Sequence, residues 1–129
     1  MKMRNATNSL GVRFAIGATF AFAAMQPAGT VLADTSANMM AGARLAHEVT
    51  KGNCLACHAM PSDPTAVTST NIGPPLVAMR TRFPNREKLR AQLWDAGAAN
   101  ADTVMPPFGR NRVLSREEIE LIIDYLYTL

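Results

Sequence analysis

Three residues near the middle of the chain restrict its fold more than any other feature. The 129-residue sequence contains two cysteines, Cys54 and Cys57, and His58 directly follows the second. On a helical turn, positions i, i+3 and i+4 lie on one face. Two thiols and an imidazole in this order form the attachment signature of c-type haem, in which both cysteines bind the porphyrin and the histidine binds iron. The motif therefore predicts one covalent haem c with His58 as an axial metal ligand.

Other uses of a Cys-x-x-Cys pair fit this sequence less well. A structural zinc site needs four ligands, usually from two separated pairs, whereas the whole chain has two cysteines and two histidines. A thioredoxin-type redox pair needs a strand before it, and residues 40–53 show no strand pattern. A disulfide across two intervening residues closes a loop too short to stabilise the chain much.

The first 33 residues have the pattern of an export signal. Lys2, Arg4 and Arg13 precede an uncharged apolar run at 14–25, and small residues at 31 and 33 suit cleavage after Ala33. The alternative is an uncleaved membrane anchor, but such an anchor needs about 20 apolar residues. We therefore expect a signal peptide at 1–33, a periplasmic domain at 34–129 and no membrane span in the mature chain.

Removal of that segment changes the charge of the protein. The chain has 13 basic and 10 acidic residues, and the segment carries three of the basic ones, which leaves 13 − 3 = 10 of each sign. A neutral domain without a general cationic surface excludes nucleic acid as a partner. Within it, residues 80–90 are basic and residues 116–124 are acidic, which predicts either two solvated helix faces or a dipolar docking surface.

A second axial ligand must come from a distant part of the chain. Met105 is followed by two prolines, which hold the segment extended and able to present a thioether to iron; Met79 is the runner-up. Four further candidates lie too close to the motif, on the His58 side: Met39, Met40, Met60 and His47. Methionine and histidine together fill both axial positions and raise the reduction potential, so we expect single-electron transfer and no catalytic residue in this chain.

The remaining sequence predicts helices around one proline-rich loop. We expect helices at 36–51 (ended by Gly52), from Asn85 to about 96, and from the capping box at Ser115 to the C-terminus. The stretch 61–75 is a loop, in which the Pro74 carbonyl can accept a hydrogen bond from the His58 ring or simply belong to a polyproline connector. The mature domain should be all-α.

These motifs, in this order, resemble the class I c-type cytochromes, and more specifically the SoxX family of sulfur-oxidation cytochrome subunits. The resemblance is carried by residues 52–58, 71–76, 83–84, 89–95, 103–111 and 124–129. It implies a class I cytochrome c-like fold around one covalently attached haem, attachment through Cys54 and Cys57, and iron ligation by His58 and Met105.

The same resemblance implies partners. SoxX-like chains form a heterodimer with a SoxA-like cytochrome subunit in the periplasm. The complex couples thiosulfate oxidatively to the reactive cysteine of a carrier protein (L-cysteine S-thiosulfotransferase), and its electrons pass to a soluble c-type cytochrome. This chain has no third cysteine to act as a nucleophile, so its expected part is electron transfer. The alternative is a stand-alone soluble c-type electron carrier without a catalytic partner.

Overall fold

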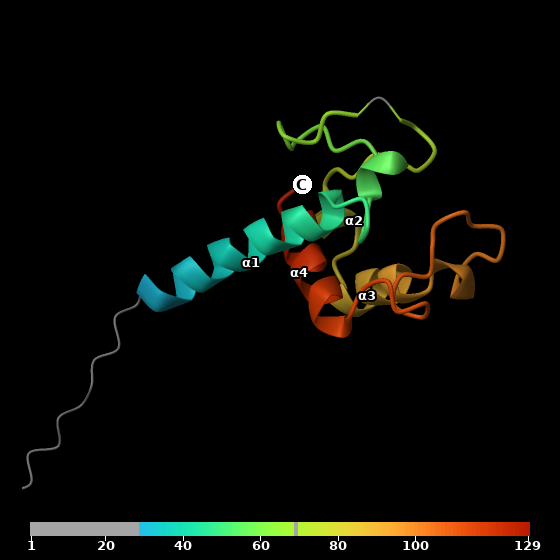
Figure 1. Ribbon diagram of the computed structural model, residues 1–129. Coiled ribbons are helices and arrows are strands. Elements are labelled where there is room, and N and C mark those ends of the chain that lie inside the picture. Colours follow the sequence, from blue (N-terminus) through green and yellow to red (C-terminus); the bar gives the residue numbers. More distant parts are fainter. Residues whose placement is uncertain (1–28, 69) are drawn as a thin grey trace, which may run out of the picture.

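The computed structural model describes residues 29–129 except residue 69, with side chains from residue 34 onward. The first 28 residues of the predicted signal peptide lie outside the described residues, and residues 29–33 belong to the first helix. The described part is helical without strands, in agreement with the all-α prediction (Figure 1). In chain order its elements are α1 (Gly29–His47), η1 (Cys54–Ala56), α2 (Met79–Arg82), α3 (Arg86–Trp94), η2 (Ala96–Ala98) and α4 (Arg116–Leu126).

Helices α1 and α4 cross in close contact, and the N-terminal half of α1 extends away from the other elements (Figure 1). Gly42 lies at the crossing. A Cβ atom at this position would lie only 2.0 Å from the Leu121 carbonyl oxygen and 2.9 Å from the Tyr125 Cβ. The two backbones can approach this closely only because residue 42 has no side chain. The sequence pattern did not single out this glycine.

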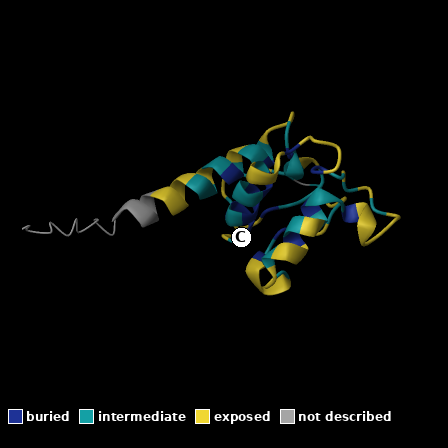
Figure 2. Cartoon of the chain, turned by 90° about the horizontal axis from the view of Figure 1, so that it is seen from below, coloured by how far each residue is buried: buried dark blue, intermediate teal, exposed yellow. Residues whose placement is uncertain are grey.

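The predicted apolar stripe of α4 forms the centre of the core. Ile119, Ile122, Ile123 and Leu126 are each at most 2% exposed, and Figure 2 shows buried residues on the inward faces of the helices. The capping box at the start of α4 is confirmed. The Ser115 Oγ accepts a hydrogen bond from the Glu118 backbone N–H at 3.1 Å, and the Glu118 carboxylate accepts one from the Ser115 N–H at 2.8 Å.

Two helix ends differ from the prediction. Helix α1 ends at His47 rather than at residue 51, and Gly52 is not its cap, because no glycine of the described part has a positive φ. Gly52 instead allows the chain to fold back over the helix end. Its N–H donates to the Leu45 carbonyl at 3.0 Å, and a Cβ there would lie 2.8 Å from that same oxygen. Helix α3 is capped by Asn85 as predicted but ends at Trp94, two residues early.

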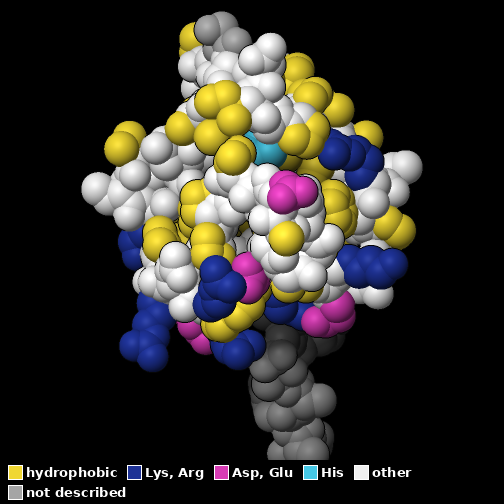
Figure 3. Space-filling view, turned by 90° about the vertical axis from the view of Figure 1, so that its right-hand side faces the viewer, with side chains coloured by type: hydrophobic (Ala, Val, Ile, Leu, Met, Phe, Trp, Pro, Cys, Tyr) yellow, Lys and Arg dark blue, Asp and Glu magenta, His cyan; other side chains and the backbone are white. Residues whose placement is uncertain are grey.

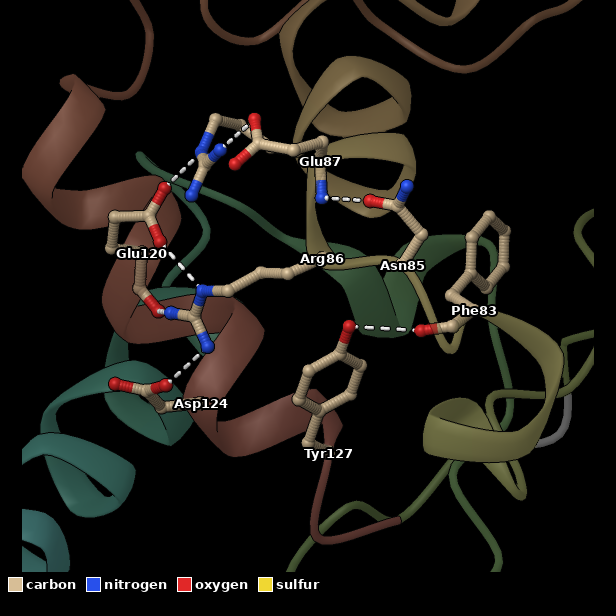
Figure 4. Close-up of polar contacts among 8 residues, drawn as sticks. Phe83, Asn85, Arg86, Glu87, Glu120, Asp124 and Tyr127 are labelled. Carbon is tan, nitrogen blue, oxygen red and sulfur yellow. Dashed lines mark hydrogen bonds and ion pairs between the residues drawn. The ribbon is translucent and has the colours of Figure 1, made fainter.

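The basic and acidic stretches of the sequence face each other. Arg86 on α3 donates to the Glu120 carboxylate at 2.8 Å and to Asp124 at 2.7 Å on α4, and Arg90 pairs with both Glu120 and Glu87 (Figure 4). Burial lowers the pKa of Arg86, but its hydrogen bonds to the two carboxylates outweigh that effect and raise it. The two stretches therefore meet across the α3–α4 contact, where Arg86 and Arg90 pair with Glu120 and Asp124.

The C-terminal residues after α4 contact the segment around α2. The Tyr127 hydroxyl donates to the Phe83 carbonyl at 2.8 Å (Figure 4), and the Arg80 guanidinium lies 4.5 Å from the centre of the Tyr127 ring. Together these contacts tie α2 to the end of α4. Within the described range, none of the helices has the length and apolar character needed to cross a membrane.

Candidate haem-binding site

A cavity of about 560 Å³ brings the predicted site residues together. It lies between the Cys-x-x-Cys-His segment, the loop at 72–76, helix α3 and the segment at 103–108. Cys54, Cys57, His58, Pro74 and Met105 all line it. Most of its wall is apolar, with polar groups at a few points, as is usual for cofactor sites. Figure 3 shows a face on which hydrophobic side chains surround a histidine, with Lys and Arg side chains toward its margin.

The two cysteines lie on and just after a short 3-10 turn. Asn53, in the left-handed conformation (φ 44°), starts this turn, and the His58 N–H donates to the Cys54 carbonyl at 2.8 Å. Both thiols are free. Burial raises the pKa of the Cys54 thiol to about 11, so this thiol stays protonated at neutral pH. A protonated thiol is a poor fit to a dithiol redox cycle, which needs a thiolate.

The His58 ring is clamped by the loop that follows it. Its Nδ1 lies 2.7 Å from the Pro74 carbonyl oxygen, which can only accept, so Nδ1 carries the proton and Nε2 keeps a free lone pair for a metal. Gly73 packs flat against the ring, where a Cβ would lie 2.4 Å from the His58 Cε1. The Gly73 N–H donates to the Cys57 carbonyl at 2.7 Å. The role of Gly73 was not visible from the sequence, in which it is simply a residue before proline.

Of the methionines with described side chains, Met79 and Met105 line the cavity. The Met105 sulfur is half-buried and lies 3.7 Å from the Gln92 Nε2. The Met79 sulfur is buried (the residue is 2% exposed) and lies 3.7 Å from the Arg82 Nη1. Both methionines therefore remain candidates for the second axial ligand. Their sulfurs have different neighbours: a neutral amide beside Met105 and a cation beside Met79.

Met60 and His47 belong to a separate polar cluster away from the cavity. Met60 is 1% exposed, and its sulfur lies 3.3 Å from the Tyr125 hydroxyl. The same hydroxyl donates to Asp63 and lies 3.2 Å from the His47 Nε2. The His47 ring is partly buried against the end of α4.

The end of the Met105 loop is fixed to α3. The N–H groups of Gly109 and Arg110 both donate to the Trp94 carbonyl, at 3.2 and 3.1 Å. A Cβ on Gly109 would lie 2.1 Å from the Trp94 ring, so this glycine is needed for the contact. Arg110 also forms an ion pair with Asp95 at 2.9 Å, which helps to hold this end of the loop against the end of α3. Trp94, the last residue of α3, does not line the cavity; its ring packs against the core cluster and against Gly109 of the loop.

The family model described as cytochrome c oxidase, cbb3-type, subunit III, matches residues 37–126. This range contains the whole cavity and all four α-helices of the described part, apart from the first residues of α1. The chain belongs to this family. It is a haem c electron-transfer protein with a class I cytochrome c fold. No curated protein matches the sequence, and the family match does not single out the SoxX subunits.

Proposed function

We propose that this chain is a periplasmic monohaem cytochrome c and the electron-transfer subunit of a SoxAX-type thiosulfate-oxidising complex. The observation that carries the electron-transfer part is the apolar cavity lined by Cys54, Cys57, His58 and Met105. Free thiols, an imidazole with an unprotonated nitrogen and a thioether are the donor set of a c-type haem, so the residues present fit this group. When bound, the haem supplies one-electron chemistry at its iron.

Each residue has a separate task in this proposal. Cys54 and Cys57 form thioether bonds that retain the cofactor. His58 binds the metal through Nε2, while its Nδ1–H donates to Pro74 and holds the ring in one orientation. Met105 would bind the iron as a second protein ligand, and the apolar wall of the cavity would exclude water. An iron held by His58 and Met105 would supply one-electron chemistry, so we propose that the chain carries electrons without transforming a bound molecule.

The choice of Met105 over Met79 rests on the charges beside each sulfur. The Arg82 guanidinium lies against the Met79 sulfur and also donates to the Pro75 carbonyl at 2.8 Å, which holds the cation in place. A fixed positive charge next to the sulfur disfavours its binding to an iron cation. Met105 faces the neutral amide of Gln92 instead.

The sulfur-oxidation role rests on the resemblance to SoxX and on the cysteine count. The chain has two cysteines, both in the attachment motif, so a substrate-carrying cysteine must belong to another protein. We propose a SoxA-like cytochrome subunit as the direct partner, with the cysteine of a carrier protein as the site of thiosulfate coupling and a soluble c-type cytochrome as the electron acceptor. Export through a signal peptide at 1–33, cleaved after Ala33, places the mature chain in the periplasm.

The axial ligand can be tested in the purified holoprotein. Ferric iron bound to a thioether gives a weak charge-transfer band near the red end of the visible spectrum. We expect Met105→Ala to abolish this band and Met79→Ala, the matched control from the same cavity, to retain it. The reverse result would assign the ligand to Met79.

The partner can be tested separately. We expect the mature chain, expressed with its genomic neighbours, to copurify with a larger c-type cytochrome. Thiosulfate should then reduce its haem when the carrier protein is present, and the reduction should stop when the carrier cysteine is replaced by serine. A monomer that stays apart from the candidate partner would leave the stand-alone electron carrier as the function.

A further inference from the structure

A cluster of metal-ligating side chains lies outside the cavity, where α1, α4 and the loop after His58 meet. His47 is the last residue of α1, Tyr125 lies on α4, and Met60 and Asp63 belong to the loop. The His47 Nε2 lies 3.2 Å from the Tyr125 hydroxyl oxygen and 3.4 Å from the Asp63 Oδ2. The Met60 sulfur lies 3.3 Å from the same hydroxyl oxygen, and Asp63 accepts its proton. An imidazole nitrogen, a carboxylate oxygen and a thioether sulfur therefore gather around a phenol oxygen.

The spacing of these atoms matches that of ligands around a tetrahedral metal ion. Zinc binds nitrogen and oxygen ligands at about 2.0–2.1 Å, which places two ligands of a tetrahedral site about 3.3–3.4 Å apart. The distances from the His47 nitrogen to the two oxygens, 3.2 and 3.4 Å, agree with this spacing. The two oxygens lie closer together because they share the Tyr125 hydroxyl proton, and they can separate when a cation replaces that proton.

Protons hold the cluster together, and a metal ion can replace them. The Tyr125 hydroxyl gives its one proton to Asp63, so its oxygen can only accept from His47. The His47 Nε2 therefore carries a proton in this arrangement. A neutral imidazole can carry its proton on Nδ1 instead, which frees Nε2 for a metal. Metal binding at such a site releases protons to solvent.

Asp63 is oriented and charged to receive a cation. Burial raises its pKa, but hydrogen bonds from Tyr125 and Thr65 outweigh that effect and hold the pKa below its ordinary value of 3.8, so the carboxylate is ionised at neutral pH. The Thr65 N–H and hydroxyl both donate to Oδ1, at 2.8 and 2.7 Å, which leaves Oδ2 facing the cluster. Groups that orient a ligand in this way accompany most metal sites. The His47 and Asp63 side chains are 23% and 11% exposed, so an ion can enter from solvent.

We propose that His47, Asp63 and Tyr125 form a binding site for a borderline divalent transition-metal ion such as Zn²⁺, with the Met60 sulfur as a weak fourth ligand. Imidazole and carboxylate are ordinary zinc ligands. The chain has two histidines, and the haem takes His58 in the proposed function, so His47 is the imidazole left for a second metal. A bound ion ties α1 to α4 and to the loop, and so stabilises the folded chain.

The test is zinc binding by the haem-loaded protein, measured by isothermal titration calorimetry. We expect wild type to bind a single equivalent of Zn²⁺ and to release protons, seen as heats that depend on the buffer. His47→Gln and Asp63→Asn each remove a ligand and should weaken binding by at least about a hundredfold, since loss of a group that merely orients a ligand already costs up to that much. Glu48→Gln is the matched control, because Glu48 adjoins His47 but is exposed and bonds to Thr50. It should bind zinc as wild type does.

Each outcome decides for or against the site. Absence of zinc binding by wild type, or equal binding by His47→Gln, overturns the proposal. A change in the haem spectrum on zinc addition would place the ion at the haem ligands and overturn it as well. If neither ligand variant folds, Tyr125→Phe, which keeps the ring and removes only the hydroxyl, decides in their place: binding should weaken at least about tenfold, and unchanged binding would refute the site. Failure here leaves the proposed electron-transfer function untouched, because the cluster shares no residue with the cavity.

Discussion

Replacement of Gly42 by alanine tests the close crossing of α1 and α4. In an exposed helix this substitution stabilises by about 1 kcal/mol, because alanine has the higher helix propensity. Here the new Cβ would lie 2.0 Å from the Leu121 carbonyl oxygen, and real contacts of this kind are not shorter than 3.0 Å, so the helices must separate locally by at least 3.0 − 2.0 = 1.0 Å. The blocking atom belongs to the backbone of α4 and cannot rotate away.

The size of the effect follows from these two opposing terms. Overpacking of a close core contact costs about 3 kcal/mol at the upper end of its usual range. The propensity gain of about 1 kcal/mol offsets part of this, which leaves a net loss of about 2 kcal/mol. For a domain of this size, such a loss lowers the melting temperature by about 8–16 °C.

The assay is thermal unfolding of the holoprotein, followed by far-UV circular dichroism. Ala91 on α3 is exposed, so Ala91→Gly provides a matched control in which propensity acts alone and costs about 1 kcal/mol. A Gly42→Ala protein that melts at or above the wild-type temperature would refute the close crossing.

Three further perturbations have defined expected results. Gly73→Ala should push the His58 ring by at least 3.0 − 2.4 = 0.6 Å and reduce the low-spin fraction in the ferric absorption spectrum; an unchanged spectrum would contradict the clamp. Arg86→Met should cost about 1 kcal/mol in urea unfolding at low salt, and a loss that persists in 1 M salt would speak against an electrostatic origin. Burial raises the pKa of Asp63, but hydrogen bonds led by that from Tyr125 outweigh it and hold the pKa below its ordinary value of 3.8. The resulting stabilisation is present above about pH 4 and is lost as pH falls through the folded pKa, so acid unfolding of Asp63→Asn should show a shallower pH dependence than wild type.

Much of the site could be predicted from the sequence because its determinants are local. The spacing of Cys54, Cys57 and His58 is a property of one turn of chain. The helix caps at Asn85 and Ser115 act over three residues. The Pro74 carbonyl was a candidate acceptor for the His58 ring on sequence grounds, but it is 16 residues away, and the fold brings it to 2.7 Å from Nδ1. The order of these motifs was enough to indicate a c-type cytochrome, and the family match bears this out.

The helix ends were predicted less accurately, because they depend on what the chain does next. Helix α1 stops at His47 since the following residues fold back toward Leu45, and Gly52 allows that return rather than capping the helix. In the linear sequence, a glycine that caps a helix cannot be distinguished from one that lets the chain fold back over the helix end.

By itself, the sequence determined the attachment motif, the capping signals, the apolar stripe of α4 and hence an all-α c-type cytochrome. Only the tertiary structure decided which distant segments meet: Gly42 with Leu121, Gly109 with Trp94, and Arg86 with Glu120. The physical reason is that motif spacing and capping depend on atoms a few bonds apart, which local geometry fixes. Close backbone approach and charge pairing depend on how whole helices pack, and no local pattern in a single chain records that arrangement.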